Sequence, residues 1–405
     1  MDKIHPHYKW YLLALVMLTN MFISAIPGMA MSVLSKEISL DLNLSLAQVG
    51  VVWGIYSLPA ILTSLLAGAI GDRLGPKRVL VVGCLIMGLL GAARGLAQNF
   101  AAMTAIIILM GVFSPFINTN GIKTCGMWFP PRQLGVANGG ISLGMALGFL
   151  VGSMLSATVL SPLLGGWRNV LILYGFVGAF FAIPWFFSHA APHDHPSAGA
   201  TRHISIPQAL RRVARIKNIW LLGLTLFGVG GCIQGLLGYL PLYLRNIGWQ
   251  PLYADGAISA FHAISLVFTL PIALYSDRLG KRKRLLFIAA VLIALGTGLL
   301  SVASGLWIWA GVLLAGFVRD GFMAIFTTMI IETEGVGPSY AGTAWGLSMA
   351  ISGIGNVVAP PLGNSLAHFG PSVPFAFWAG LAVFGIICLL GTRGAASQAA
   401  GGSGR

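Results

Sequence analysis

The sequence predicts an all-α integral membrane protein with twelve transmembrane helices in two halves, and three observations lead to that prediction. The chain of 405 residues is 57% hydrophobic and only 8% charged, whereas soluble domains carry roughly 25% charged residues. Apolar runs recur along the chain, and each is long enough to cross the hydrocarbon core of a membrane as a helix. A short charged motif also occurs twice, once in each half.

The apolar runs divide into two groups of six. The first run begins at Trp10 and is too long for a signal peptide, and no cleavage site follows it. The longest polar interruption, 190–217, predicts a cytoplasmic linker between an N-terminal bundle over 1–189 and a C-terminal bundle over 218–405. The expected spans are 10–34, 47–70, 79–98, 101–127, 134–160, 168–189, 219–243, 254–275, 285–303, 306–331, 341–366 and 372–391.

The distribution of basic residues predicts the orientation. With both termini in the cytoplasm, 19 of the 24 Lys and Arg residues fall in cytoplasmic segments, as the positive-inside rule requires. The outer segments and helix ends hold Lys36, Arg94, Arg168 and Arg245, and Arg319 lies within a span. We therefore expect a multi-pass protein of the inner, cytoplasmic membrane. The net charge of +14 reflects topology, so nucleic acid is not an expected partner.

The repeated motif lies in the loop after the second span of the N-terminal half and after the second span of the C-terminal half. The first copy contains Asp72-Arg73-Leu-Gly, and the second contains Asp277-Arg278-Leu-Gly. A further echo relates Gly135-Val-Ala-Asn-Gly to Gly342-Thr-Ala-Trp-Gly, at nearly the same offset. Two echoes at one offset indicate duplicated halves, as in many transporter folds.

The segment Gly68–Arg78 reads Gly-x-x-x-Asp-Arg-x-Gly-x-Lys-Arg and resembles the signature loop of the major facilitator superfamily. Its second copy and the Gly-Gly-Trp-Arg sequence at 165–168 look similar to that superfamily as well, and the resemblance covers the whole chain. It implies secondary transport by alternating access, with two pseudo-symmetric six-helix bundles around a cavity lined by helices 1, 4, 7 and 10.

The loop residues are candidates for a conformational gate: Asp72, Arg73, Asp277 and Arg278. A carboxylate at a helix end can meet a helix N-terminus or pair with a basic side chain, and such contacts can break when the halves move. The alternative is that the loop only sets the topology and a tight turn.

Helix 10 contains the adjacent charges Arg319 and Asp320. Charged side chains within a membrane are costly and usually have a function, and a guanidinium suits a carboxylate or another planar anion. Neighbours on a helix point about 100° apart, so these two side chains need not pair with each other. We expect Arg319 to contact the substrate; the alternative is a structural ion pair.

Proton coupling has two candidate residues. Asp320 is the acidic residue expected near mid-membrane, and His262 in helix 8 is a second titratable group. A single histidine can equally be a hydrogen-bonded structural residue. Seven further polar side chains are substrate-binding candidates, although each could instead bond a neighbouring helix: Asn20, Ser24, Tyr56, Asn118, Gln234, Tyr239 and Asn356.

The leading hypothesis is a transporter of a small organic anion, with a single arginine favouring a monocarboxylate, driven by proton symport or anion exchange. Proton-coupled exporters of drugs and amphiphiles are one alternative. Such exporters of the superfamily usually have a proline in helix 5 and an arginine near the centre of helix 4. Here 134–160 contains no proline, and helix 4 has Ser114 and Asn118 but no central arginine, which disfavours this alternative. Carriers of nitrate or cyanate are a second alternative. They often have two arginines in the cavity, whereas only Arg319 is evident here.

Other functional classes fit the sequence less well. A channel needs a continuous polar pore, and the spans carry few polar residues. An enzyme needs a nucleophile–base cluster, a metal constellation or a phosphate-binding loop, and the sequence contains none of these patterns. We therefore expect no cofactor, no metal and no catalytic residue. A channel or receptor on the same fold remains a separate possibility, and a monomer in the lipid bilayer is the expected assembly.

Overall fold

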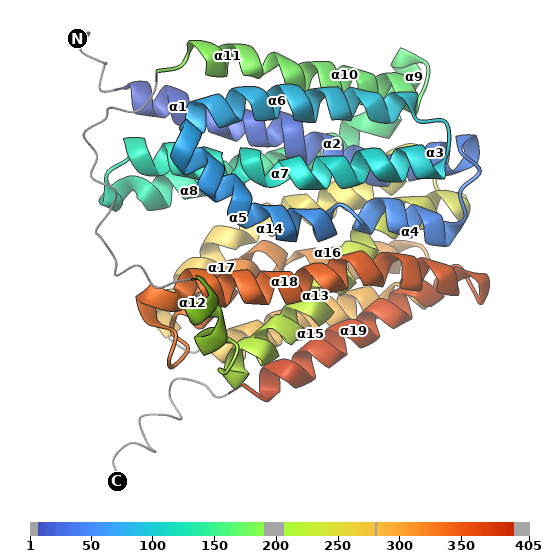
Figure 1. The fold of residues 1–405 in the computed structure, drawn as a ribbon. Coiled ribbons are helices and arrows are strands. Elements are labelled where there is room, and N and C mark those ends of the chain that lie inside the picture. Colours follow the sequence, from blue (N-terminus) through green and yellow to red (C-terminus); the bar gives the residue numbers. More distant parts are fainter. Residues whose placement is uncertain (1–6, 190–205, 280–281, 393–405) are drawn as a thin grey trace. The chain divides into compact units, whose positions relative to one another are not determined.

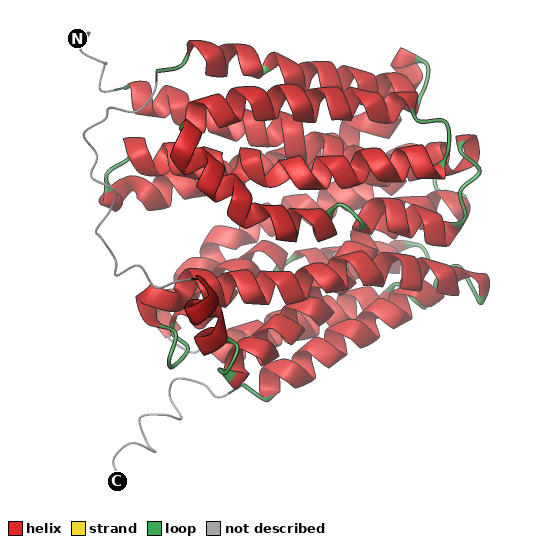
Figure 2. Ribbon diagram, in the orientation of Figure 1, coloured by secondary structure: helices red, strands yellow, loops and turns green. Residues whose placement is uncertain are grey.

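The computed structural model describes residues 7–189, 206–279 and 282–392. Helices make up most of this part of the chain, and no β-strand occurs within it (Figure 2). Ten helical stretches of the described residues are long and apolar enough to cross a membrane. The two other expected spans are also helical, over Arg282–Leu299 and Gly337–Ser365. The predicted helical membrane fold is therefore confirmed, whereas 190–205 of the expected linker lies outside the described residues.

Two spans of the first half contain a π-helical segment. The segment η1 (Met21–Ala25) interrupts the first span, and η4 (Ser156–Leu160) interrupts the fifth. Such bulges within α-helices often occur at functional sites. The α-helices of this half are α1 (Tyr8–Asn20), α2 (Ile26–Val33), α3 (Ser35–Asp41), α4 (Leu46–Gly54), α5 (Ser57–Leu74), α6 (Pro76–Ala93), α7 (Phe100–Trp128), α8 (Leu134–Leu155), α9 (Ser161–Leu164), α10 (Trp167–Phe180) and α11 (Ala182–Phe187), with short 3₁₀ segments at η2 (Arg94–Leu96) and η3 (Pro131–Gln133).

The second half begins with a short helix, α12, and continues with long spans. One of these, the tenth span, is interrupted: α16 ends at Gly316 and α17 begins at Arg319. The helices of this half are α12 (Ile206–Val213), α13 (Lys217–Asn246), α14 (Pro251–Leu279), α15 (Arg282–Leu299), α16 (Leu306–Gly316), α17 (Arg319–Ile331), α18 (Gly337–Ser365) and α19 (Val373–Leu390), with a 3₁₀ turn at η5 (Leu366–His368).

The chain forms two compact units. The first comprises Met1–Pro196 and Leu240–Ser259, and the second comprises Ser197–Tyr239 and Ala260–Arg405. The end of α13 and the start of α14 therefore belong with the first six spans. Lys36, just after the first span, donates to the carbonyl oxygen of Arg245 at 3.0 Å, which is one of the contacts that hold this turn in the first unit.

Glycines allow close helix packing in the first unit. Helix α6 lies along α10 (Figure 1), and a Cβ added at Gly88 would lie only 2.3 Å from the backbone nitrogen of Ala179. Helix α8 packs on α1 and α2 in the same way. A Cβ at Gly152 would lie 2.7 Å from the carbonyl oxygen of Ile26, so the two backbones are in contact. The fifth span carries a glycine stripe at four-residue spacing, which forms a packing surface for the first span: Gly140, Gly144, Gly148 and Gly152.

In the second unit α15 packs against α16, α17 and α19. Trp378 of α19 is fully buried, and its indole nitrogen donates to the carbonyl oxygen of Ala359 in α18 at 2.9 Å. The ring fills space beside Gly235 and Gly363, where an added Cβ would lie 2.3 and 2.2 Å from it. This tryptophan therefore joins α13, α18 and α19, and it satisfies its own polar atom in doing so.

Candidate functional site

The break in the tenth span lies against α14 and gathers four polar side chains there. Close contact is possible because glycines flank the break. A Cβ at Gly316 would lie 2.7 Å from the carbonyl oxygen of Phe261, and one at Gly321 would lie 2.8 Å from Ile272. Helix α14 therefore runs close to both sides of the break. We call the four residues that meet there the α14–α17 cluster: His262, Ser265, Arg319 and Asp320.

Asp320 is the centre of this cluster. The Ser265 hydroxyl donates to Asp320 Oδ2 at 2.7 Å, and the Asp320 backbone N–H donates to the Ser265 oxygen at 3.1 Å. Asp320 also lies in the first turn of α17, where the partial positive charge of the helix N-terminus stabilises a carboxylate. The ring of His262, 2% exposed, interacts electrostatically with both Arg319 and Asp320.

Arg319 and Asp320 form an ion pair although they are adjacent in sequence. Arg319 Nη1 donates to Asp320 Oδ1 at 2.6 Å. The pairing places a guanidinium and a carboxylate at the start of α17, and their side chains are 23% and 27% exposed. Neither side chain is fully buried, so both the guanidinium and the carboxylate keep exposed atoms.

The other predicted binding residues of the first unit do not form one cluster. Asn20 is buried and its amide donates to the Val16 carbonyl oxygen at 2.9 Å. The Ser24 hydroxyl lies in the π-helical segment and is buried without a hydrogen-bond partner among the described residues. Tyr56 is half-buried and hydrogen-bonds to Ser114, and Asn118 is exposed on α7.

In the second unit, Asn356 lies on α18 against α13. A Cβ added at Gly230 of α13 would lie 3.4 Å from Asn356 Oδ1, and the half-buried Gln234 follows one turn later. Tyr239 lies further along, where its hydroxyl donates to the Pro371 carbonyl oxygen at 3.0 Å and its ring packs on Phe375. The structure therefore gives Tyr239 a packing contact and places Gln234 and Asn356 on facing helices.

The signature loop of the first half is tied to the fourth span. Lys123 of α7 donates to Asp72 Oδ1 and to the Gly68 carbonyl oxygen, both at 2.6 Å. Asp72 remains 74% exposed, and Arg73 is exposed. Gly75 has φ +83° at the turn, a conformation that favours glycine.

The corresponding loop of the second half shows a related contact. Arg282, at the start of α15, forms an ion pair with Glu332, at the end of α17. The side chains of the other two gate candidates, Asp277 and Arg278, lie outside the described residues. In each half, a residue at the loop is thus paired with the fourth or tenth span of the same half.

Sequence reasoning missed three buried charges of the first unit: Arg94, Arg245 and Asp255. Asp255 is fully buried and accepts hydrogen bonds from Arg245 Nη2 at 2.7 Å and from the Thr158 hydroxyl at 2.6 Å. Arg94 is only 3% exposed, although the sequence placed it with the outer helix ends. The sequence does contain a sign of the Arg245–Asp255 ion pair, because these two residues carry opposite charges on either side of one short turn.

A family model of the Major Facilitator Superfamily matches residues 13–351 and 247–404 of the chain. This chain belongs to the major facilitator superfamily. The resemblance seen in the signature loop is thereby confirmed, and the chain is a multi-pass membrane transporter and not an enzyme.

Relatives of this transporter include carriers named for organic acids. It is 26% identical over 243 residues to the probable L-galactonate transporter of Escherichia coli K12, covering 57% of this chain and 53% of that one. It therefore spans about half the length of that relative. It is 24% identical to the probable sulfoacetate transporter SauU of Cupriavidus necator, covering 92% and 90% of the two chains.

The fold is also shared with solved transporter structures. A bacterial homolog of the human lysosomal transporter Spinster, in an inward-facing and unoccupied conformation, superposes with a TM-score of 0.76 and 16% identity. The superposition covers 95% of this transporter and 96% of that chain. At this identity the likeness supports the fold alone.

Proposed function

We propose that this transporter carries a small organic anion, most favourably a monocarboxylate, and that the anion binds at Arg319. The observation that carries the proposal is the partly exposed ion pair of Arg319 with Asp320 at the break of the tenth span. Asp320 accepts from Arg319 through Oδ1 and from Ser265 through Oδ2. An incoming carboxylate can offer the guanidinium two oxygens, and charge-assisted bonds of this kind are strong and directional. Once Asp320 is protonated, the single guanidinium balances one negative charge of the substrate.

The same pair supplies a coupling mechanism. Protonation of Asp320 removes the charge that neutralises Arg319, so the guanidinium then attracts an external carboxylate more strongly. Substrate and proton therefore bind cooperatively and cross the membrane as a neutral pair, and the linkage is reciprocal. His262 interacts with both charges and is the second candidate for the proton. Exchange against a counter-anion is the alternative coupling, in which Asp320 stays ionised.

The relatives support the substrate class. Galactonate and sulfoacetate, the compounds for which two relatives are named, each carry a carboxylate. At identities of 24% and 26%, the relatives support the class of substrate and not the compound. We further propose residence in the inner membrane as a monomer, with both termini cytoplasmic, and a cytoplasmic gate that includes Asp72, Arg73, Asp277 and Arg278.

Uptake into proteoliposomes tests the proposal. Labelled lactate, pyruvate, galactonate, oxalate, nitrate and a cationic dye are compared with and without an acid-outside pH gradient. We expect saturable monocarboxylate uptake that the gradient raises, and little uptake of nitrate or dye. Arg319→Ala should lower the uptake at least ~10-fold, because the lost charge-assisted bond contributes ~1.5–3 kcal/mol. Arg132→Ala, in an exposed turn, is the matched control and should leave uptake unchanged.

The Asp320→Asn variant separates the two coupling modes. Under symport it loses gradient-driven accumulation but keeps exchange of one anion for another, because Arg319 is still present. Full accumulation by Asp320→Asn would show that Asp320 does not carry the proton. Preferential uptake of nitrate or of the dye would instead support one of the alternative substrate classes.

A further inference from the structure

The first unit contains a second guanidinium, Arg94, in surroundings unlike those of Arg319. It follows directly after α6, and its side chain is almost wholly buried at 3% exposure. Its Nε and Nη1 atoms make only long hydrogen bonds, to the Gly91 carbonyl oxygen at 3.5 Å and to the Pro27 carbonyl oxygen at 3.4 Å. Its Nη2 atom has no hydrogen-bond partner among the described residues.

The charge of Arg94 is not balanced by a carboxylate within the described part of the chain. None of the ion pairs there includes Arg94, and the titratable group that interacts with it is the neutral Tyr56. A guanidinium remains protonated in proteins. A buried charge without a counter-charge is strongly unfavourable, so a missing partner is to be expected.

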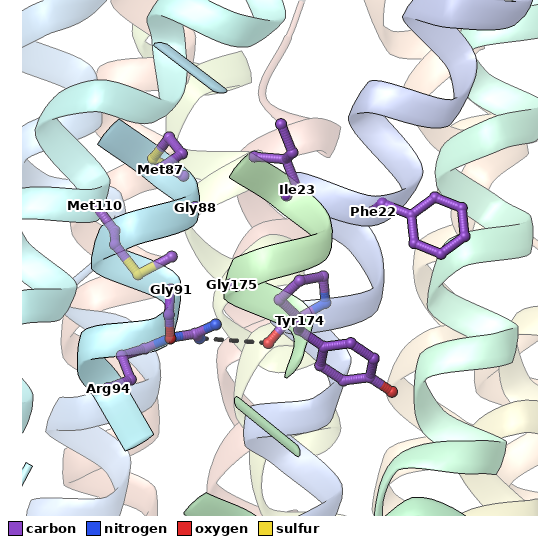
Figure 3. A pocket seen from close by; sticks show the side chains of 11 residues that line it. Phe22, Ile23, Met87, Gly88, Gly91, Arg94, Met110, Tyr174 and Gly175 are labelled. Atoms are coloured by element: carbon purple, nitrogen blue, oxygen red, sulfur yellow. Dashed lines mark hydrogen bonds between the residues drawn. The ribbon is translucent and has the colours of Figure 1, made fainter. Parts of the chain in front are cut away.

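A small cavity of about 10 Å³, measured as the space open to the centre of a water-sized sphere, adjoins this side chain. Its walls come from the first span, α6, α7 and α10. Figure 3 shows Arg94 at one end of the lining residues, with Met110 nearer to it and Met87 further along α6. Gly91 of α6 and Gly175 of α10 are among the residues that line it. A Cβ at Gly175 would lie 2.2 Å from the Ala92 backbone nitrogen, so the two helices leave no room for a side chain there.

The composition of the walls selects the class of ligand. Phe22, Ile23 and the two methionines are apolar or weakly polar, and the Tyr174 hydroxyl is already bonded to Ser156 at 2.9 Å. One positive charge with one unused N–H group cannot replace the hydration shell of a multiply charged anion such as phosphate. It suits a small, weakly hydrated ion with one negative charge.

We propose that the Arg94 cavity binds one small monovalent inorganic anion, chloride under ordinary ionic conditions, as the counter-charge of the buried guanidinium. This site is separate from the proposed substrate site at Arg319, because its walls belong entirely to the first unit. Water alone could occupy the unused N–H group, but it would leave the charge unbalanced.

Thermal unfolding of the purified transporter tests the proposal. Chloride or bromide is titrated at constant ionic strength against a bulky sulfonate that is too large for the cavity. A ligand that binds only the folded state raises Tm with the logarithm of its concentration, and we expect a rise of roughly a few °C. Arg94→Met should abolish this halide dependence. Arg319→Met, at the proposed substrate site, and Arg168→Met, whose arginine pairs with Asp41, should keep it.

Crystals grown with bromide provide a test that needs no variant. An anomalous difference peak within hydrogen-bond distance of Arg94 Nη2 is expected in the unaltered transporter. The proposal is overturned if no peak occurs there, or if Arg94→Met keeps the halide-dependent rise in Tm. A peak without any halide effect on unfolding would identify an adventitious ion and would overturn it as well. Loss of substrate uptake in Arg319→Met, with an unchanged halide response, distinguishes this site from the proposed function.

Discussion

Two ion pairs of the first unit differ mainly in their surroundings. Arg245 and Asp255 are buried, with side chains 7% and 0% exposed, and Glu37 lies 4.0 Å from the same guanidinium. Lys123 and Asp72 are at the surface of the signature loop, where Asp72 is 74% exposed. Solvent screens the second pair, whereas removal of one buried partner leaves an uncompensated charge.

The two pairs therefore predict unequal effects on stability. Asp255→Ala should lower the free energy of unfolding by ~3–5 kcal/mol, toward the lower end because Glu37 partly compensates Arg245. Asp72→Ala, the matched control, should cost less than ~1 kcal/mol. Denaturant or thermal unfolding in detergent measures both. Equal losses for the two variants would contradict the distinction between a buried and an exposed pair.

At the scale of helices, close packing depends on where a glycine faces another backbone. Both Gly139 and Gly152 belong to α8. A Cβ at Gly152 would lie 2.7 Å from the Ile26 carbonyl oxygen and 2.8 Å from its Cα, whereas nothing lies within 4 Å of a Cβ at Gly139. The four-residue spacing of glycines in α8 indicates a face for close packing, but only the structure shows that its partner is the first span.

Substitution of these two glycines should have opposite effects. Gly152→Ala forces the first span away from α8, and overpacking of this kind costs ~1–3 kcal/mol. Gly139→Ala should be neutral or stabilising by up to ~1 kcal/mol, because alanine favours a helix more than glycine does. The midpoints of thermal unfolding of the two purified variants measure both changes in stability. A loss of stability in Gly139→Ala as large as that in Gly152→Ala would refute the packing account.

The sequence predicted elements better than contacts. Apolar run length alone placed all the spans, because a helix must cross a fixed thickness of hydrocarbon. It could not predict the interruption between Gly316 and Arg319, since neither proline nor a polar run occurs there. The pairing of Arg319 with Asp320 depends on that interruption and on Ser265 of α14. Contacts between distant spans leave no periodic pattern in one sequence.

The burial of charges near the ends of spans was the other limit of sequence reasoning. Arg94 and Asp255 lie near the ends of apolar runs, where a charge usually reaches the membrane surface. The structure instead turns both side chains inward, to 3% and 0% exposure. The sequence identified Arg319 and Asp320 correctly as charges within a span, because they lie far from either end of it.

For the whole molecule, the fold and the family are those of a major facilitator superfamily transporter. The proposed substrate class, a small monocarboxylate, depends on the guanidinium of Arg319 and the neighbouring carboxylate of Asp320. If Arg319 binds the carboxylate of the substrate, then replacing that carboxylate by an amide and removing the guanidinium should not have additive effects.

Equilibrium binding of a transported monocarboxylate and of its amide, to the unaltered transporter and to Arg319→Ala, tests this claim most directly. The unaltered transporter should prefer the carboxylate by roughly 10- to 100-fold, as expected for a hydrogen bond between charged groups. Arg319→Ala should bind the two compounds with nearly equal affinity. An undiminished preference for the carboxylate in Arg319→Ala would contradict the account.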